Sequence, residues 1–566
     1  MNRIVCIIPA RITSSRLPGK HLKLIGDATL IENQYTALIN VFPNEVEIKY
    51  AIPDGKENDL LAMFLKSRTI PFYRGSEEDV FSRVLLGVDK DKHDWLIRIN
   101  GDNVFIIDEL IMAVLKEISD DQYDMVSNVS PRTYPKGCSI EAIRTSTFCC
   151  VNEKYDLSGD DREHVMTYFY RELDSSRIKN IALLNDYSNH SLSLDTFKDY
   201  RVVSRVIQKF GSKISECDLK SVCEEVKLFN SENPFAGKHG PFMIAEVGGN
   251  HEGDFEYAKR LVEEACLSDA DCVKLQIYSP DLLVNKYLSP QRHKHFGKFA
   301  LSTSQYKELL KIIRDSGKSV SASVWSIQEL NEFIDEIDFI KVGSGDLTDA
   351  LMLNAIRETG KPVIISTGLA TIDNVAFAIR KLDPEGSRGD ELGILQCTSM
   401  YPIPKFDANL NVMDTFGQAF PQYLIGYSDH TTDINALSYS VAAGAEILEF
   451  HFTDCKHDRD FRDHQVSLTL SDVEALVKNV IEIKSLQGVK EKQPAICEVV
   501  NGHVTSFRKG VFLNKDLKSG ETIKYEDLIT LRPCEGISAL DSDKVVGLKL
   551  KADISAYCKL EWGFFE

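Results

Sequence analysis

The sequence of 566 residues lacks the features that mark membrane, secreted and zinc-binding chains. No apolar run approaches roughly 18 residues, which excludes a transmembrane helix of ordinary length. The first residues, "MNRIVCIIPARIT", lead directly into a strand-like segment, so we expect no signal peptide. The 13 cysteines are scattered and form no C-x-x-C pair, which is typical of reduced thiols. We therefore expect a cytoplasmic protein without a disulfide framework.

Basic residues are scarce as well. The chain has 66 Lys and Arg against 85 Asp and Glu, a formal net charge of −19. Such an acidic surface disfavours nucleic acid as a partner, and the lack of a basic run disfavours an anionic membrane. An ordinary apolar content of 43% indicates a globular protein. Its length exceeds what one hydrophobic core normally holds, so we expect about three or four domains.

Residues 1–230 alternate strand-like and helix-like segments. This alternation favours a mainly parallel sheet covered by helices, as in a Rossmann-like α/β domain. The expected strands are the apolar runs at 4–10, 48–53, 95–100, 124–129 and 192–195. The stretch that follows, "SENPFAGKHGP" at 231–241, is rich in polar residues, Pro and Gly, and it predicts a linker.

Residues 242–495 contain eight more strand candidates separated by amphipathic segments. The candidates are 242–248, 272–278, 319–325, 339–345, 362–368, 392–398, 423–429 and 447–453. Eight βα units in about 250 residues are the pattern of a (β/α)₈ TIM barrel, whose chemistry lies at the C-terminal strand ends. Nearly every predicted end carries a polar residue: Glu246, Lys274, Gln276, Ser323, Lys341, Ser344, Ser366, Ser428, Asp429, His430, Glu449 or His451.

A final unit at 503–566 has short strands and many turns. It is too short for another α/β domain, so we expect a small, mostly β appendage. No internal repeat is visible beyond the βα alternation.

His430 and His451 follow neighbouring predicted strands and should therefore reach one rim of the barrel. Two neutral imidazoles with open positions suit a divalent metal ion. The alternative is two ordinary histidines bonded to loop backbone. Lys341, Ser323 and Ser366 could hold a phosphate group at the same mouth, although "GSG" and "STG" are also common turn sequences.

A series of motifs in this order closely resembles the sialic acid synthase family: "IAEVGGNHEG", "VKLQ", "IKVGSGDL", "VIISTGLAT", "QCTSMYPIP", "IGYSDHTTD" and "ILEFHFTD". That family condenses phosphoenolpyruvate with an N-acylhexosamine. The tail, with "RPCEGIS", resembles the family's antifreeze-like (SAF) domain. The chain departs from the family pattern at Asp346, where Glu is usual, and at Ser399, where Asn is frequent.

The resemblance implies roles for these residues. His430 and His451 would bind Mn²⁺ or a similar metal, Lys341 would hold the phosphate, Lys274 would lie near the carboxylate, and Glu246 would manage a water or proton. Further phosphate contacts would come from Ser323, Ser344, Ser366 and Ser428. The sugar would contact Gln276, Tyr401 and Asp463, and Asp346 would lie near the substrate.

The first domain carries a basic loop, "IIPARITSSRLPGKH" at 7–21, with Arg11, Arg16 and Lys20. The G-x-x-x-x-G-K-[ST] motif is absent, so this is not a P-loop. Asp102 and Asp195 each end a predicted strand. Two carboxylates beside a cationic loop suit Mg²⁺-nucleotide chemistry, and the alternative is a basic solvated loop.

This domain resembles the cytidylyltransferases that activate 3-deoxy-2-ulosonic acids, most closely the spore-coat polysaccharide branch. The motifs are "RLPGK", "FYRGSEEDVFSR", "RINGDNVFIID", "TYPKGCSIE", "REHVMTYFY" and "LDTFKDY". The resemblance implies that CTP binds Arg11, Arg16 and Lys20, with Arg11 and Lys20 also catalytic. Arg74, Ser76 and Asn100 would lie near the nucleoside, and Asp102 and Asp195 would hold Mg²⁺. Lys198 follows Phe197 where the family usually has Pro-Glu.

Together the two resemblances predict one chain with two consecutive activities. The barrel would make a 3-deoxy-ulosonic acid, with Glu246, Asn250 and His251 at the first rim of its site, and the first domain would transfer CMP to that acid. Two alternatives stay open: one half is a non-catalytic module, or the barrel catalyses a related aldol reaction. The acid could be neuraminic, legionaminic, pseudaminic or eight-carbon. The resemblance also implies a homodimer in which Arg532 of the SAF domain reaches the other subunit's sugar site.

Overall fold

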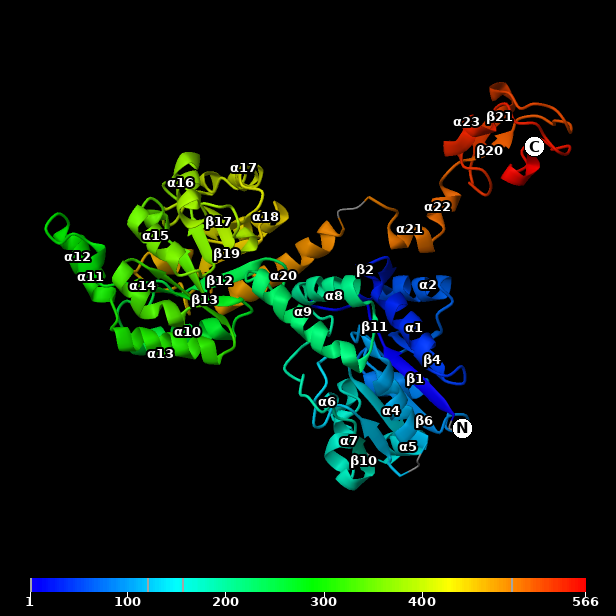
Figure 1. Cartoon of the computed structure of the whole chain (residues 1–566), viewed down its shortest axis with the longest axis horizontal. Helices are drawn as coiled ribbons and strands as arrows, with labels where there is room; N and C mark the ends of the chain where they lie inside the picture. Colours follow the sequence, from blue (N-terminus) through cyan, green and yellow to red (C-terminus); the bar gives the residue numbers. More distant parts are fainter. Residues whose placement is uncertain (1–2, 120–121, 155–156, 490–491) are drawn as a thin grey trace.

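The computed structural model describes residues 3–119, 122–154, 157–489 and 492–566. Figure 1 shows three units along the chain: an N-terminal α/β domain in blue to cyan, a barrel in green to yellow, and a small C-terminal unit in orange to red. Within these residues no helix is both long and apolar enough to cross a membrane, and no disulfide is formed.

The N-terminal domain contains a seven-stranded sheet in the order β10-β8-β9-β6-β1-β4-β5. Its strands are β1 (Ile4–Pro9), β4 (Glu47–Pro53), β5 (Phe72–Gly75), β6 (Trp95–Ile99), β8 (Met125–Ser127), β9 (Ile140–Arg144) and β10 (Ile178–Asn180). All neighbours are parallel except β9, which runs antiparallel to β6 and β8. The expected mainly parallel sheet is confirmed.

Both faces of this sheet are covered. Ile4, Cys6 and Ile8 of β1 belong to one apolar cluster, while Val5 and Ile7 belong to the other. Alternate residues of a strand point to opposite faces, so a continuous apolar run fits a strand buried on both sides. The covering helices include α1 (Leu30–Val41), α2 (Asp59–Ser67), α3 (Val80–Leu86), α4 (Asp108–Ser119), α5 (Thr145–Lys154), α6 (Gly159–Glu163), α7 (Thr167–Glu172), α8 (Phe197–Phe210) and α9 (Leu219–Glu232).

One strand prediction is wrong. Residues 192–195 form no strand of the sheet, and Ser191 and Ser193 make only isolated bridges with Lys136 and Asn103. Strands β5, β9 and β10 of the sheet were not predicted.

The central unit is a closed barrel of eight parallel strands. These are β12 (Phe242–Glu246), β13 (Cys272–Ile277), β14 (Ser319–Val324), β15 (Phe339–Val342), β16 (Val363–Ser366), β17 (Leu392–Cys397), β18 (Leu424–Asp429) and β19 (Ile447–His451). Each lies within its predicted range, so the TIM-barrel prediction is confirmed. The outer helices include α10 (Phe255–Leu267), α13 (Thr303–Asp315), α14 (Ile327–Phe333), α15 (Ala350–Glu358), α16 (Ile372–Leu382), α17 (Val412–Ala419), α18 (Asn435–Ala442) and α20 (Leu470–Gln487). Two further helices, α11 (Pro280–Leu283) and α12 (Pro290–Phe299), follow β13, and the short α19 (Asp463–Val466) follows β19.

The N-terminal end of the barrel is closed by an aromatic cluster. The ring of Phe235 lies 5.5 Å from that of Phe242 and 5.0 Å from that of Phe339, centroid to centroid. All three belong to the apolar cluster at this end of the barrel. Phe235 comes from the stretch 231–241, so this connection is packed into the barrel rather than loose.

The C-terminal unit contains α21 (Ile496–Val500), α22 (His503–Ser506), β20 (Gly510–Leu513), β21 (Leu528–Leu531) and α23 (Ser542–Val545). It has a small apolar core of its own. Ile496 and Val500 pack against the core of the N-terminal domain. Figure 1 shows β20, β21 and α23 of this unit far from the barrel of its own chain.

Candidate active sites

The barrel carries a cavity of about 490 Å³ at the C-terminal ends of its strands. The register of the parallel strands sets Glu246 beside Lys274 on one side and beside His451 on the other. Short polar side chains and the two lysines therefore converge at one mouth, as the strand pattern predicts. The lining includes Glu246, Lys274, Gln276, Arg292, Phe296, Ser323, Trp325, Lys341, Ser344, Asp346, Ser366, Cys397, Ser399, Tyr401, Ser428, His430 and Glu449.

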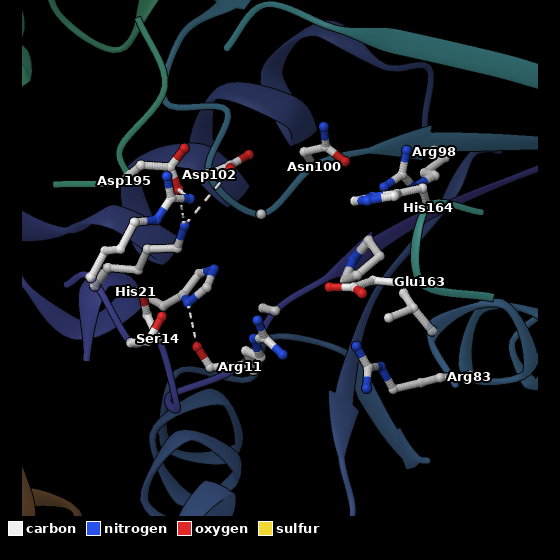
Figure 2. Close-up of a pocket in the computed structure, with 17 residues that line it drawn as sticks. Arg11, Ser14, His21, Arg83, Arg98, Asn100, Asp102, Glu163, His164 and Asp195 are labelled. Carbon is white, nitrogen blue, oxygen red and sulfur yellow. Dashed lines mark hydrogen bonds and ion pairs between the residues drawn. The ribbon is translucent and has the colours of Figure 1, made fainter. Parts of the chain in front are cut away.

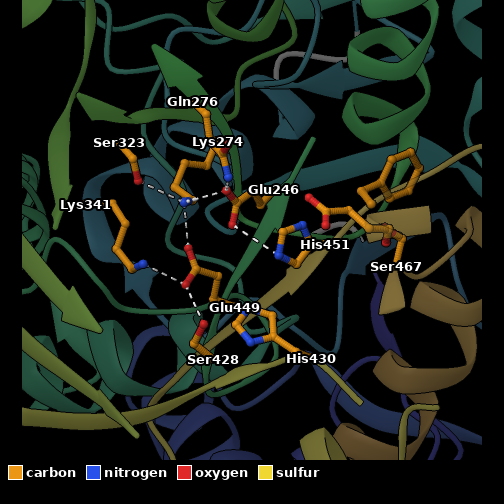
Figure 3. A network of polar contacts seen from close by, with 12 residues as sticks. Glu246, Lys274, Gln276, Ser323, Lys341, Ser428, His430, Glu449, His451 and Ser467 are labelled. Atoms are coloured by element: carbon orange, nitrogen blue, oxygen red, sulfur yellow. Dashed lines mark hydrogen bonds and ion pairs between the residues drawn. The ribbon is translucent and has the colours of Figure 1, made fainter. Parts of the chain in front are cut away.

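A charged network occupies the floor of this cavity (Figure 3). The Nζ atom of Lys274 lies 3.0 Å from Glu449 Oε1 and 3.1 Å from Glu246 Oε1. The Nζ atom of Lys341 lies 2.9 Å from Glu449 Oε2, which also accepts a 2.8 Å hydrogen bond from Ser428 Oγ. Lys274 and Glu449 are 1% and 2% exposed. Two lysines and two glutamates thus balance each other where water is excluded.

The network decides the ionisation of its members. Burial alone would raise the pKa of Glu449, but Lys274 and Lys341 outweigh it and hold that pKa well below its usual range. Burial would lower the pKa of Lys274, yet Glu246 and Glu449 raise it above its ordinary value. Glu246, Glu449 and Lys274 are therefore charged near neutral pH, and Glu449 holds both Lys274 and Lys341 where an anionic ligand can bind.

The two predicted histidines lie together. The imidazole centroids of His430 and His451 are 5.2 Å apart, and the Tyr401 ring packs 4.1 Å from that of His430. Nδ1 of His430 bonds to the carbonyl of Thr398 at 2.9 Å, which leaves Nε2 for another partner. Burial opposes the charged form of His430, but Cys397, Thr398 and Glu246 outweigh it and raise its pKa to about 9.

This pair fits a divalent metal ion, whose binding requires both rings to be neutral and would displace the proton that His430 holds. Nδ1 of His451 is buried without a hydrogen-bond partner, and Nε2 lies 3.9 Å from a carboxylate oxygen of Glu246. In the described part of the chain, no group of three or more His, Cys, Asp or Glu side chains has metal-binding geometry. An ion here would therefore be held by His430 and His451, with the remaining positions open to substrate or water.

The other sequence-predicted residues separate into two groups. Gln276, Ser323, Ser344, Asp346, Ser366, Tyr401 and Ser428 line the cavity. The Ser366 hydroxyl is buried without a partner and is free for a ligand. Asp463 is buried beside His451 but outside the lining, and its charge acts on the pKa of His451. Arg532 belongs to the C-terminal unit, where its Nε donates a 2.7 Å hydrogen bond to the carbonyl of Phe507.

Asn250 and His251 take other positions. The Asn250 amide donates 2.8 Å hydrogen bonds to Phe452 O and Ser467 Oγ, and so ties the loop after β12 to the segment after β19. Nδ1 of His251 accepts from the backbone N–H of Gly253. Neither residue lines the cavity.

Sequence reasoning missed the centre of the network. Glu449 was noted as a strand-end residue without a role, although it contacts both lysines. Its position two residues before His451 on the same strand was the available signal, because such residues share a face. Arg292, Phe296 and Trp325 also line the mouth, and no motif marked them.

The N-terminal domain carries a second cavity of about 310 Å³ (Figure 2). Its lining includes Arg11, Ser14, Arg16, Lys20, His21, Arg83, Arg98, Asn100, Asp102, Glu163, His164 and Asp195. Asp102 and Asp195 come together because the backbone N–H of Leu194 donates to Asp102 O at 3.1 Å. Gly101 is needed beside them, since an added Cβ would lie 2.3 Å from Pro9 O.

Cations surround the two carboxylates. Nζ of Lys20 lies 3.1 Å from Asp195 Oδ1 and 3.7 Å from Asp102 Oδ2, and Arg16 lies 3.0 Å from Asp195 Oδ1. Burial, together with the charge of Lys20, lowers the pKa of His21 to about 3, so this ring is neutral. Two adjacent carboxylates near a polyphosphate-sized hollow fit Mg²⁺, a hard cation that prefers oxygen ligands.

Arg74 and Ser76 do not line this cavity. Arg74 pairs with Asp59 at 2.6 Å, and Ser76 Oγ accepts from the backbone N–H of Asp79. The residues that sequence reasoning missed are Arg83, Arg98, Glu163 and His164. A neighbouring hollow of about 360 Å³ shares Arg98, Asn100 and His164 and adds Arg132, Glu141 and Tyr170.

Comparisons with known proteins match both of the domains that carry these cavities. The NeuB family model matches residues 261–492, and a Cytidylyltransferase model matches residues 5–231. N,N'-diacetyllegionaminic acid synthase of Legionella pneumophila is 35% identical over 60% of this chain and 99% of its own length. Human N-acetylneuraminate-9-phosphate synthase is 32% identical over 56% of this chain and 89% of its own length.

A solved structure supports the fold. A spore coat polysaccharide biosynthesis protein E from Chromobacterium violaceum superposes with a TM-score of 0.52 at 23% identity, over 58% of this chain and 99% of its own. The chain therefore belongs to the NeuB family, and the domain on the N-terminal side of its barrel matches the Cytidylyltransferase model.

Proposed function

We propose that the barrel condenses phosphoenolpyruvate with an N-acylated hexosamine to a 3-deoxy-nonulosonic acid. The N-terminal domain then transfers CMP from CTP to this acid. The observation that carries the proposal is the buried Lys274–Glu449–Lys341 network beside the His430 and His451 pair. Two preorganised ammonium groups suit the phosphate and carboxylate of phosphoenolpyruvate, while imidazoles and Glu246 stand where an aldehyde would react.

In the condensation, C3 of phosphoenolpyruvate forms a bond to the aldehyde carbon, water adds to C2, and inorganic phosphate leaves. Lys341 holds the phosphate with Ser323, Ser344, Ser366 and Ser428, and Lys274 lies at the carboxylate. Glu246 accepts the proton from the water, because it keeps its charge in the network. A divalent ion such as Mn²⁺, when bound by His430 and His451, supplies polarisation of the aldehyde oxygen. Gln276, Tyr401, Asp346 and Asp463 orient the sugar.

In the N-terminal domain, Arg11, Arg16 and Lys20 hold the CTP phosphates, and Asp102 and Asp195 are the ligands for Mg²⁺. The anomeric hydroxyl of the acid attacks the α-phosphate, and pyrophosphate leaves. The acid enters the adjoining hollow, where Arg132 can meet its carboxylate and Asn100 lies at the border of both hollows. Arg98 is paired with Glu141 at 2.7 Å, which fixes the wall between them.

We also propose that the working form is a homodimer, with the C-terminal unit acting as a SAF domain on the barrel of the other subunit. Arg532 lies on a unit that is remote from its own barrel, which supports a contribution to a neighbouring site (Figure 1).

The test is incubation with phosphoenolpyruvate, CTP, Mg²⁺, Mn²⁺ and a panel of N-acylated hexosamines, followed by mass spectrometry. The expected result is phosphate release that depends on one hexosamine and a product with the mass of its CMP-nonulosonate. Phosphate release without a CMP-sugar, even when ready-made acids are supplied, would leave only the synthase active. Phosphate release that occurs only with non-acylated sugars would instead favour a related aldol reaction in the barrel.

A further inference from the structure

The helix that follows Asp195 is fastened to the base of the barrel. Helix α8 begins at Phe197, two residues after this carboxylate, and Thr196 caps it by accepting from the backbone N–H of Asp199. The backbone N–H of Phe197 donates to Lys238 O at 3.2 Å. Lys238 lies in the packed connection 231–241, so the first turn of α8 is bonded to residues outside the N-terminal domain.

Lys238 is in turn fixed to two barrel strands through one carboxylate. Its backbone N–H donates to Asp271 Oδ1 at 2.9 Å, and the backbone N–H of Met243 in β12 donates to Asp271 Oδ2 at 2.9 Å. Asp271 directly precedes β13. The Nζ atom of Lys238 also pairs with Asp269 at 2.6 Å. Lys238, Asp269 and Asp271 therefore connect the start of α8 to the barrel wall.

Lys198 adds a charge to this junction. It is the second residue of α8, and burial lowers its pKa; Asp271 is the strongest attractive charge acting on it. Burial likewise raises the pKa of Asp271 to about 6, with two backbone donors and Lys198 acting in the opposite direction. Asp271 therefore accepts two backbone hydrogen bonds at this junction and carries a charge that acts on Lys198, while Asp195 lines the nucleotide cavity from the segment just before α8.

We infer that Lys198 and Asp271 are positioning residues for the nucleotide reaction, which makes the base of the barrel a structural part of the cytidylyltransferase site. The inference rests on the proposed function of that site. Asp195 is held by Arg16 and Lys20 on one side and by the start of α8 on the other. Helix α8 is bonded to the barrel through Lys238 and Asp271. Loss of these contacts should therefore displace Asp195 and lower the affinity of the nucleotide site for its metal ion.

The test uses the full chain with Lys198→Met, Lys198→Arg and Asp271→Asn. Lys209→Met is the matched control, because Lys209 is at the other end of α8 and Arg205 keeps its partner Glu225 paired. The Mg²⁺ concentration for half-maximal pyrophosphate release is measured for each variant. Mn²⁺ binding is measured by electron paramagnetic resonance in a His430→Ala, His451→Ala background, which removes the barrel site.

We expect Lys198→Met and Asp271→Asn to raise the Mg²⁺ requirement and to weaken Mn²⁺ binding about tenfold. Lys198→Arg should keep most of the metal affinity of the native chain. A chain with both Lys198→Met and Asp271→Asn should bind metal no more weakly than the more severe single variant. Phosphate release by the barrel should persist in Lys198→Met. If the variants lose thermal stability but keep the metal dependence of Lys209→Met, the residues are merely structural and the inference is overturned.

The two proposals fail in distinguishable ways. An unsubstituted chain that makes no CMP-sugar but binds Mn²⁺ in the N-terminal domain refutes the proposed function, and the Mn²⁺ series still tests the positioning. A reference protein that binds no Mn²⁺ there removes the role given to Asp195 and overturns the inference as well.

Discussion

Glu449 neutralises two buried lysines, so its removal should be costly. Glu449→Gln leaves Lys274 and Lys341 without half of their counter-charge, and breaking a buried pair costs about 3–5 kcal/mol. We expect a loss of this size in urea unfolding and the loss of condensation, with CTP chemistry kept. Glu474→Gln, on an exposed position of α20, is the control. Equal stability of the two variants would contradict the network's role.

Asp346 predicts a pH dependence of stability. Burial raises its pKa to about 6 from an ordinary 3.8. Because the pKa of Asp346 is higher in the folded than in the unfolded chain, its protonation contributes to the free energy of unfolding. This contribution is full below pH 3.8 and is lost as the pH rises through 6. Asp346→Asn should therefore be more stable than the native chain above pH 6, by about 1 kcal/mol after allowance for solvent.

The gain from Asp346→Asn should vanish near pH 4, and thermal melts at pH 4.5 and 8 measure it. Sugar binding should weaken, because the carboxylate lines the cavity. If Asp346→Asn is more stable than the native chain by the same amount at both pH values, the Asp346 carboxylate does not titrate as proposed.

At the scale of single residues, the sequence predicted which side chains line the barrel cavity better than it predicted which of them contact one another. His430, His451, Lys274, Lys341 and Glu246 could be named because barrel topology brings strand ends together. Which lysine contacts which glutamate depends on strand register and side-chain length, and neither is written in a motif. Arg74 lay near a recognisable motif, yet Asp59 holds it outside the cavity.

At the scale of elements, apolar runs predicted all eight barrel strands because parallel strands are buried on both faces. The same reasoning failed at 192–195, where alternating Leu and Ser resemble a strand but Asp102 and Lys136 bind the segment as a loop. The antiparallel β9 was missed because Glu141 interrupts its apolar pattern. That carboxylate is satisfied by Arg98 and Tyr170, partners that lie far away in the sequence.

The aromatic cluster of Phe235, Phe242 and Phe339 gives a prediction about the connection 231–241 between the N-terminal domain and the barrel. Phe235→Ala would leave a cavity beneath Phe242 and Phe339, and such substitutions cost about 3–5 kcal/mol. We expect calorimetry to show a lower unfolding temperature for the barrel. The substrate affinity of the protein that remains folded should not change. Phe406→Ala, at a site 82% exposed, should have little effect. A similar loss in both variants would mean that Phe235 is not part of the barrel core.

At the scale of the molecule, the barrel cavity and the attachment of the N-terminal domain lie at opposite ends of the barrel. The synthase cavity lies at the C-terminal strand ends, while the N-terminal domain is attached at the opposite end through Phe235, Lys238 and Asp271. Under the proposed function, the acid made in the barrel must leave its cavity to reach CTP. With ¹³C-phosphoenolpyruvate and excess unlabelled acid, we expect CMP-sugar diluted to the isotope ratio of the free pool. Preferential labelling would instead show direct transfer.

The C-terminal unit raises the last question at this scale, because the unit that carries Arg532 lies far from the barrel of its own chain (Figure 1). Its planar guanidinium can hold several sugar oxygens at once, which suits a site completed by a second chain. Arg532→Ala and His430→Ala proteins should each lack synthase activity. Mixed under conditions of subunit exchange, they should regain activity, because one site of each mixed dimer keeps both residues.

The alternative is a surface arginine held only by Phe507, and its loss would then be worth at most about 1 kcal/mol of stability. Tagged pull-down establishes that exchange has occurred, and the native chain mixed with His430→Ala sets the activity expected for half-active dimers. Exchange without recovered activity would mean that Arg532 acts within its own chain or not at all. Recovery would place residues of two chains in one active site and explain why a unit so remote from its own barrel is part of this protein.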